Sequence, residues 1–333
     1  MTGPILIVDD EPQNLAALEQ ILSGDYQLIF ARNGAQALTA ALKHVPSLIL
    51  LDIEMPGMNG YAVCRELKAD KRTDGIPVIF VTSLADVGDE AAGFAVGAVD
   101  YIIKPVSPAI VSARVRTHLS LVRATLLEQS YLDAIYMLGE AGHHNDNDTG
   151  VHIWRMAAYC KALAAACGWN AAACNQIELA APMHDTGKIG IPDSVLKKPG
   201  KLDAAEWVVM KTHSRIGHDI LAKSKAPVFQ MAAQIALSHH ERWDGSGYPN
   251  ALAGESIPES ARIVALADVY DALTMKRPYK EAWPIDRAIA TMKESAGSHF
   301  DPRLVDTFVS IQPQIVKIQA EWNALEAKGE EGI

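Results

Sequence analysis

The chain has 333 residues, of which 49% are hydrophobic and 21% are charged, and this length fits two domains better than one. The formal net charge is −10 and both halves are acidic, which argues against binding to the phosphate backbone of DNA. Asp9 and Asp10 leave no room for a signal peptide, and no apolar run is long enough to insert into a membrane, so we expect a cytoplasmic protein.

Five short apolar runs in the first part of the chain alternate with segments of helical periodicity. The apolar runs are 5–8, 28–30, 48–51, 78–81 and 101–103. The helical segments are 13–23, 34–44, 59–69 and 86–96. Continuously apolar strands separated by helices are typical of a parallel sheet covered on both faces. Residues 1–122 are therefore predicted to form an α/β domain, a flavodoxin-like doubly wound five-stranded parallel sheet.

Polar residues stand at the ends of four of these runs. Asp9 and Asp10 end the first, Asp52 ends the third, and Thr82 and Lys104 end the fourth and fifth. The carboxyl ends of parallel strands form one crevice, so these side chains should converge. Carboxylates that share a crevice repel one another unless a hard cation joins them, and magnesium suits such oxygen ligands.

The pattern over residues 3–122 resembles the receiver domain of bacterial two-component response regulators. The resemblance implies that Asp52 accepts a phosphoryl group, with a sensor histidine kinase as the partner that supplies it. It also implies that Asp9, Asp10 and Asp52 hold magnesium in this domain.

Three further residues match the receiver pattern. Thr82 and Lys104 would bind the phosphoryl oxygens, and the peptide bond between Lys104 and Pro105 would be cis. Tyr101 would be the aromatic switch residue that rotates when Thr82 moves.

The segment 107–137 is predicted to be a connecting helix, because residues 109–137 contain neither proline nor glycine. The seam of a coiled coil has alternating four- and three-residue steps. Those steps are followed by Val115, Leu119, Val122 and Leu126. Packing of the last receiver helix on its own sheet would explain the beginning of this stretch but not its length. We therefore expect a helix that also offers a homodimer interface.

The motif at residues 184–188 places two metal-ligand side chains next to each other and an amine shortly after them. Neighbouring residues on a helix point about 100° apart, so a joint role for His184 and Asp185 indicates two metal ions, or one ion and a bridging group, at a helix end. Gly187 is expected to free the backbone so that Lys188 can return toward the metals.

The pattern after residue 137 is helical throughout and contains nine of the eleven histidines. Helical bundles build dinuclear sites from such inward-facing side chains. The candidate ligands are His152, His184, Asp185, His213, His239, His240 and Asp268, with Asp148 one helical turn before His152. Imidazole and carboxylate ligation without thiolate suits iron, manganese, nickel or zinc.

Residues 239–249 read His-His-Glu-Arg-Trp-Asp-Gly-Ser-Gly-Tyr-Pro. This segment resembles the signature of the HD-GYP domain, a branch of the HD phosphohydrolases, and the resemblance covers residues 130–315. We therefore assign residues 130–333 to an all-α HD-type metal-dependent phosphohydrolase domain.

The resemblance implies two metal ions, with iron or manganese favoured over nickel or zinc. Part of the cluster would be ligated by His152, His184, Asp185 and Asp268. The second ion would be held by His213, His239 and His240, with Asp185 bridging. Family members with three ions usually carry a glutamate where this chain has Asp148, so a third ion is left open.

Family members hydrolyse cyclic di-GMP to linear pGpG or to GMP. The resemblance assigns catalysis to Asp185 and Lys188, with Lys188 on the scissile phosphate. It assigns further substrate contacts to Tyr248, Arg277 and Lys280. Two alternatives stay open: hydrolysis of another nucleotide or cyclic dinucleotide, and a catalytically weak module that acts through protein contacts. The motifs do not fix the sign of regulation by Asp52.

Overall fold

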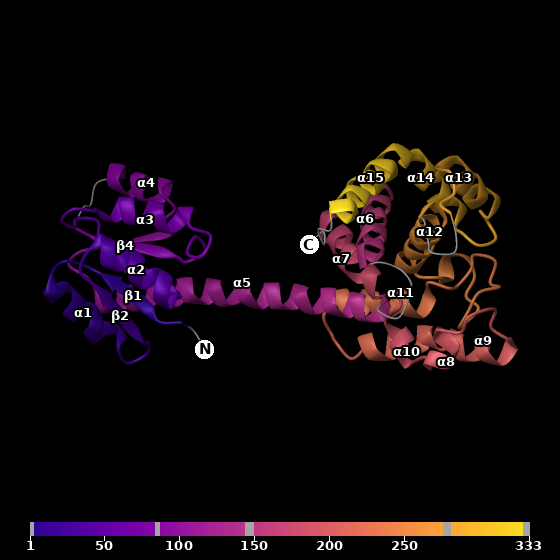
Figure 1. Cartoon of the computed structure of the whole chain (residues 1–333), viewed down its shortest axis with the longest axis horizontal. Helices are drawn as coiled ribbons and strands as arrows, with labels where there is room; N and C mark the ends of the chain where they lie inside the picture. Colours follow the sequence, from indigo (N-terminus) through magenta and orange to yellow (C-terminus); the bar gives the residue numbers. More distant parts are fainter. Residues whose placement is uncertain (1–2, 84–86, 144–149, 276–280, 329–333) are drawn as a thin grey trace. The chain divides into compact units, whose positions relative to one another are not determined.

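The structure is a computed structural model that describes residues 3–83, 87–143, 150–275 and 281–328. The chain divides into two compact units, Met1–Ser130 and Tyr131–Ile333. Figure 1 shows the elements of both units, and each unit has a hydrophobic core of its own.

The first unit is built on five parallel strands in the order β2-β1-β3-β4-β5. The strands are β1 Ile5–Val8, β2 Leu28–Ala31, β3 Leu48–Leu51, β4 Val78–Thr82 and β5 Asp100–Ile103. This is the flavodoxin-like order, so the predicted fold of the first domain is confirmed. The order reverses between β1 and β3, and a crevice is expected beyond the carboxyl ends of these two strands.

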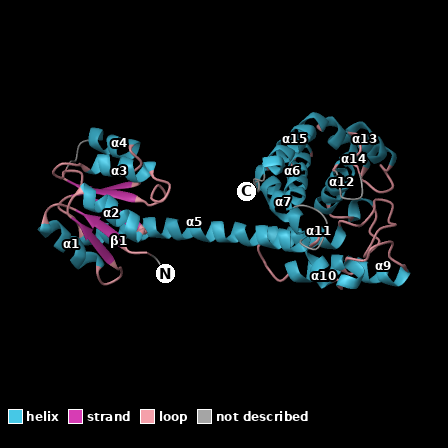
Figure 2. Cartoon of the chain, in the orientation of Figure 1, coloured by secondary structure: helices cyan, strands magenta, loops and turns pink. Residues whose placement is uncertain are grey.

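Helices cover both faces of the sheet. Successive side chains of a strand point to opposite faces, so each strand packs against helices on both sides. Leu6 and Val8 of β1 pack with residues of α2 (Gly34–His44) and α3 (Gly60–Ala69). Ile5 and Ile7 pack instead with α1 (Pro12–Leu22) and with the beginning of α5. The remaining helix of this unit, α4, spans Val87–Ala95, and Figure 2 shows the sheet among these helices.

Helix α5 runs without interruption from Pro108 to His143. Val115 and Leu119, together with Val111, are buried in the core of the first unit. The predicted coiled-coil seam is therefore wrong at Val115 and Leu119, since both pack on the sheet. Farther along the helix, Leu126 and Leu127 are 63% and 72% exposed.

The second unit is built from helices, as predicted. Its α-helices are α6 Gly150–Ala166, α7 Ala171–Ala180, α8 Asp193–Leu196, α9 Ala204–Lys211, α10 His213–Leu221, α11 Pro227–Ser238, α12 Glu259–Thr274, α13 Ile285–Glu294, α14 Pro302–Ser310 and α15 Gln312–Lys328. Its 3-10 helices are η1 Ala181–Met183, η2 Thr186–Gly190 and η3 Gly254–Ser256. Within the described part of the chain, no helix has the length and apolar character needed to cross a bilayer.

Candidate active site

Three acidic residues of the first unit converge at the carboxyl ends of β1 and β3. Ligand oxygens of Asp9, Asp10 and Asp52 lie within 4.8 Å of one another. Lys104, which follows β5, places Nζ 2.8 Å from Asp9 Oδ2 and 2.8 Å from Asp52 Oδ2. Such a set of hard oxygen ligands fits a magnesium ion.

Burial raises the pKa of Asp52, and the neighbouring Lys104 only partly offsets this effect. Burial also lowers the pKa of Lys104, but its hydrogen bonds to Asp52 and Asp9 outweigh burial, and the net shift is upward. The ammonium group therefore stays charged beside the two carboxylates and can neutralise an anion bound there.

The other predicted receiver residues also have defined positions. Thr82 is buried at the last position of β4. Tyr101 is buried, its ring centroid lies 5.5 Å from that of Phe80, and its hydroxyl oxygen lies 3.0 Å from that of Tyr61. The peptide bond between Lys104 and Pro105 is cis, as predicted.

In the second unit, His184 and Asp185 lie at the junction of two 3-10 turns. His184 directly follows η1, and Asp185 directly precedes η2. The predicted position at a helix end is therefore confirmed, and the helices that meet there are 3-10 helices. The change of turn between the two residues brings neighbouring side chains together, and His184 Nε2 lies 3.3 Å from Asp185 Oδ2.

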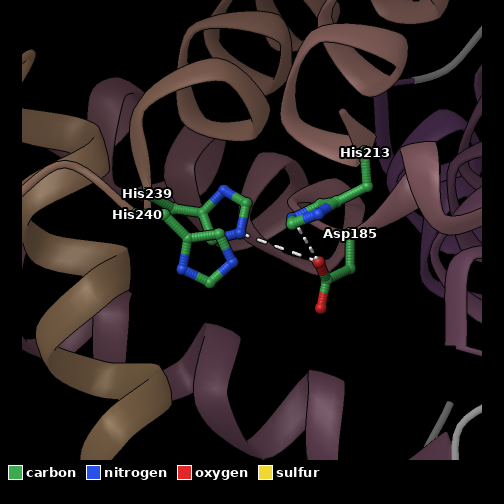
Figure 3. A group of neighbouring side chains, drawn as sticks. All are labelled: Asp185, His213, His239 and His240. Atoms are coloured by element: carbon green, nitrogen blue, oxygen red, sulfur yellow. Dashed lines mark ion pairs between the residues drawn. The ribbon is translucent and has the colours of Figure 1, made fainter. Parts of the chain in front are cut away.

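The carboxylate of Asp185 lies at the centre of the candidate metal site. Its Oδ1 is 3.4 Å from His213 Nε2 and 3.7 Å from His239 Nε2. Its Oδ2 lies 3.3 Å from His184 Nε2 and 2.7 Å from Lys188 Nζ. Figure 3 shows the rings of His213 and His239 directed at this carboxylate. One carboxylate thus contacts two sets of nitrogen groups through different oxygens.

Three of the imidazoles are oriented by backbone carbonyl groups. Nδ1 lies 2.9 Å from Ala181 O in His184 and 2.8 Å from Met210 O in His213. In His239, Nδ1 lies 3.1 Å from the carbonyl oxygens of Ile235 and Ala236. When Nδ1–H donates to a carbonyl group, the lone pair of Nε2 remains available for a metal ion.

The donor set fits a transition-metal ion. Ligand atoms of Asp185, His213, His239 and His240 lie within 4.8 Å of one another. His239 Nε2 is buried and has no hydrogen-bond partner among the described residues, which is costly unless another group binds it. Nitrogen and carboxylate ligands without thiolate suit iron, manganese, nickel or zinc.

The net pKa shift differs among the histidines. It lowers the pKa of His213 to about 4 and that of His240 well below its usual value, so both rings are neutral and able to bind metal. Burial also lowers the pKa of His184, but the charge of Asp185 dominates and the result is about 9. His184 must therefore release a proton when it binds an ion near neutral pH.

His152 and Asp268 form the other part of the candidate site. His152 lies on α6 and Asp268 on α12, and His152 Nε2 is 3.8 Å from Asp268 Oδ1. The charge of Asp268 also contributes to the raised pKa of His184, but neither His152 nor Asp268 is among the four residues whose ligand atoms lie within 4.8 Å of one another.

The loop after His240 is shaped by close backbone contacts. A Cβ atom on Gly247 would lie 2.4 Å from Arg242 N, so only glycine fits there. Glu241 is buried, and its carboxylate accepts hydrogen bonds from the backbone N–H groups of Asn250 and Leu252. The loop thereby places Tyr248 over His240, with ring centroids 4.7 Å apart.

Some predicted residues lie outside the described part of the chain: Asp148, Arg277 and Lys280. Two buried residues were not singled out from the sequence, Arg155 and Asp271. Asp271 accepts hydrogen bonds from Arg155 and lies against His152. The sequence pattern that could have identified them is their spacing, because each stands three residues after a candidate ligand on the same helix.

Comparison with known proteins agrees with the two-unit structure. Residues 5–116 match the response regulator receiver domain, and residues 129–304 match the HD domain. A probable cyclic di-GMP phosphodiesterase of Vibrio cholerae serotype O1 is 40% identical over 347 residues, which cover 94% of this chain and 79% of that protein.

Two further relatives are informative. The cyclic di-GMP phosphodiesterase response regulator RpfG of Xanthomonas campestris pv. campestris is 38% identical over 97% of this chain and 92% of its own length. The 3'3'-cGAMP-specific phosphodiesterase 2 of Vibrio cholerae is 43% identical over 58% of this chain and 37% of its own. The chain therefore belongs to the response regulators that join a receiver domain to an HD-GYP domain, the cyclic di-GMP phosphodiesterase family.

Proposed function

We propose that this chain hydrolyses cyclic di-GMP to pGpG, GMP or both, and that phosphorylation of Asp52 by a sensor histidine kinase controls the rate. The observation that carries the proposal is the carboxylate of Asp185. One of its oxygens faces His213 and His239, whereas the other faces His184 and Lys188. This arrangement supports a dinuclear site in which Asp185 would be a ligand of both ions.

Iron or manganese are the ions that we propose for this centre. The proposed ligands are His152, His184, Asp185, His213, His239, His240 and Asp268, and a third ion would also use Asp148. When bound, such ions would lower the pKa of a water molecule and stabilise charge on the phosphoryl oxygens.

The protein side chains would bind and orient the substrate. Lys188 Nζ, held 2.7 Å from Asp185 Oδ2, is proposed to contact the scissile phosphate and offset the negative charge that develops there. The ring of Tyr248, stacked on His240, would contact the ligand from the loop. Arg277 and Lys280 are proposed to bind the substrate phosphates.

The proposal is tested by measuring metal content and hydrolysis on the full-length protein. Purified protein loaded with manganese or iron would be given cyclic di-GMP or 3'3'-cGAMP, and the products would be separated by chromatography. We expect a higher kcat/KM for cyclic di-GMP. Faster turnover of 3'3'-cGAMP would favour the second candidate function, which the name of one relative supports. A protein that binds no metal and hydrolyses neither would favour a module acting through protein contacts.

Helix α5 is the proposed route of regulation. Its first part packs in the core of the first unit through Val111 and Val115. Near its end, a Cβ atom on Gly142 would lie 2.9 Å from Thr186 Cα, directly after Asp185. A shift of this helix in response to Asp52 would therefore reach the backbone beside the metal ligand. We also propose that α5 forms a homodimer through its exposed part.

A further inference from the structure

Asp271 is a buried carboxylate on α12 that contacts a candidate metal ligand. It is fully buried, and its Oδ2 accepts a hydrogen bond from His152 Nδ1. Arg155 binds the same carboxylate with two nitrogens, Nε at 2.7 Å from Oδ1 and Nη2 at 2.8 Å from Oδ2. A two-point contact of this kind fixes the plane of the carboxylate, and with it the direction of its bond to His152.

His152 differs from three other candidate metal ligands in how its ring is held. The rings of His184, His213 and His239 are oriented by backbone carbonyl groups three or four residues earlier in the chain. Those partners lie three or four residues away in the chain, so they do not depend on a distant segment. The ring of His152 depends instead on a side chain that is 119 residues away in the sequence.

Arg155 extends this contact to the C-terminal helix. It is 1% exposed, and its Nη1 lies 3.4 Å from Asn323 Oδ1 and 3.9 Å from Glu326 Oε2, both on α15. A buried guanidinium is costly unless its donors are satisfied, so α15 helps to keep Arg155 in place. The series α15, Arg155, Asp271 and His152 thus joins the end of the described chain to the candidate metal site.

We propose that Asp271, clamped by Arg155, is a positioning residue that holds His152 Nε2 toward Asp268 and so controls the metal position that uses His152. This inference rests on the proposed metal centre. Among the described hydrogen bonds and ion pairs, Asp271 has no direct contact with His213, His239 or His240, so we expect the position formed by those three residues to keep its metal.

The test compares manganese binding by the full-length protein and by Asp271→Asn. Affinity and stoichiometry would be measured by calorimetry and elemental analysis, independently of activity. Loss of a hydrogen bond that orients a metal ligand typically weakens metal binding by about 10–100-fold. We expect that loss at one metal position only, with the other unchanged. The matched control is Asp301→Asn, which alters a buried aspartate paired with Arg262 instead of a histidine.

A second variant separates positioning from a general effect on folding. If Asp271 acts through His152, then adding Asp271→Asn to His152→Ala should weaken manganese binding no further. An additional loss in the double variant, or equal losses at both metal positions, would overturn the positioning role. The positioning role would also be overturned if the single variant Asp271→Asn bound manganese as well as Asp301→Asn does. A wild-type protein that binds no manganese or iron would overturn the metal centre itself.

Discussion

Gly187 lies against the backbone of His213. A Cβ atom on Gly187 would be 1.9 Å from the carbonyl oxygen of His213 and 2.4 Å from Gly217 N. Glycine is therefore needed at this position because α10 approaches η2 closely, and not, as the sequence suggested, to let the backbone turn Lys188 toward the metals. This contact sets the distance between Asp185 and His213.

Gly187→Ala should destabilise the second unit and weaken metal binding, because the added methyl group must push α10 and His213 away. Overpacking of this kind lowers the free energy of unfolding by about 1–3 kcal/mol or more. Thermal unfolding and bound metal would be measured together. Gly75→Ala is the control, since a Cβ atom there would meet nothing within 4 Å. Equal behaviour of the two variants would contradict the close contact.

Lys188→Ala should lower kcat for cyclic di-GMP and leave the metal in place. Removing one group that stabilises the charge of the transition state typically lowers kcat by about 10²–10³-fold. Steady-state kinetics and metal content on the same preparation are the measurements. Lys197→Ala removes an exposed lysine paired with Asp193 and should have no effect. Loss of metal from Lys188→Ala would show that the lysine maintains the site instead of acting on the substrate.

Removal of the metals should lower the unfolding temperature of the second unit. A ligand present at 100 times its Kd stabilises the folded state by about 2.7 kcal/mol, which corresponds to a shift of roughly 5–10 °C for a unit of this size. Calorimetry with and without a chelator measures the shift. Asp185→Asn lacks the central carboxylate, so the chelator should leave its unfolding temperature unchanged. A shift of the same size in that variant would contradict binding at Asp185.

Asp52→Ala should abolish the response to a phosphoryl donor and retain the metals of the second unit. The reason is that the acceptor carboxylate and the metal ligands belong to different units. The rate of cyclic di-GMP hydrolysis would be measured with and without a small phosphoryl donor. The idea of two independent sites fails if this variant loses its transition metals.

Leu126→Glu combined with Leu127→Glu should convert a dimer into a monomer, because these two leucines are among the most exposed of the apolar side chains that α5 offers after Leu119, a group that also includes Leu121 and Met137. Light scattering gives the solution mass. Val208→Glu is the control, since Val208 on α9 is also exposed, at 69%. A wild-type chain that is monomeric both with and without phosphorylation would exclude the dimer.

Much of this molecule follows from local patterns. The apolar runs predicted all five strands to within one residue at each end, because burial on both faces of a sheet requires unbroken apolar sequence. The predicted coiled-coil seam on α5 was wrong at its first two positions, because spacing alone does not identify what a buried face packs against. Val115 and Leu119 show the same spacing whether they face a second copy or their own sheet, and only the folded unit distinguishes the two.

For the candidate active site, the sequence determined which residue types are present and in what order, since the chemistry of imidazole, carboxylate and amine is a property of each side chain. The tertiary structure decided which oxygen of Asp185 meets which nitrogen, and why Gly187 is glycine. It also decided that Asp271, 119 residues from His152, holds that ring. Such partners meet only when α6 and α12 pack together, and no local period of the sequence records that contact.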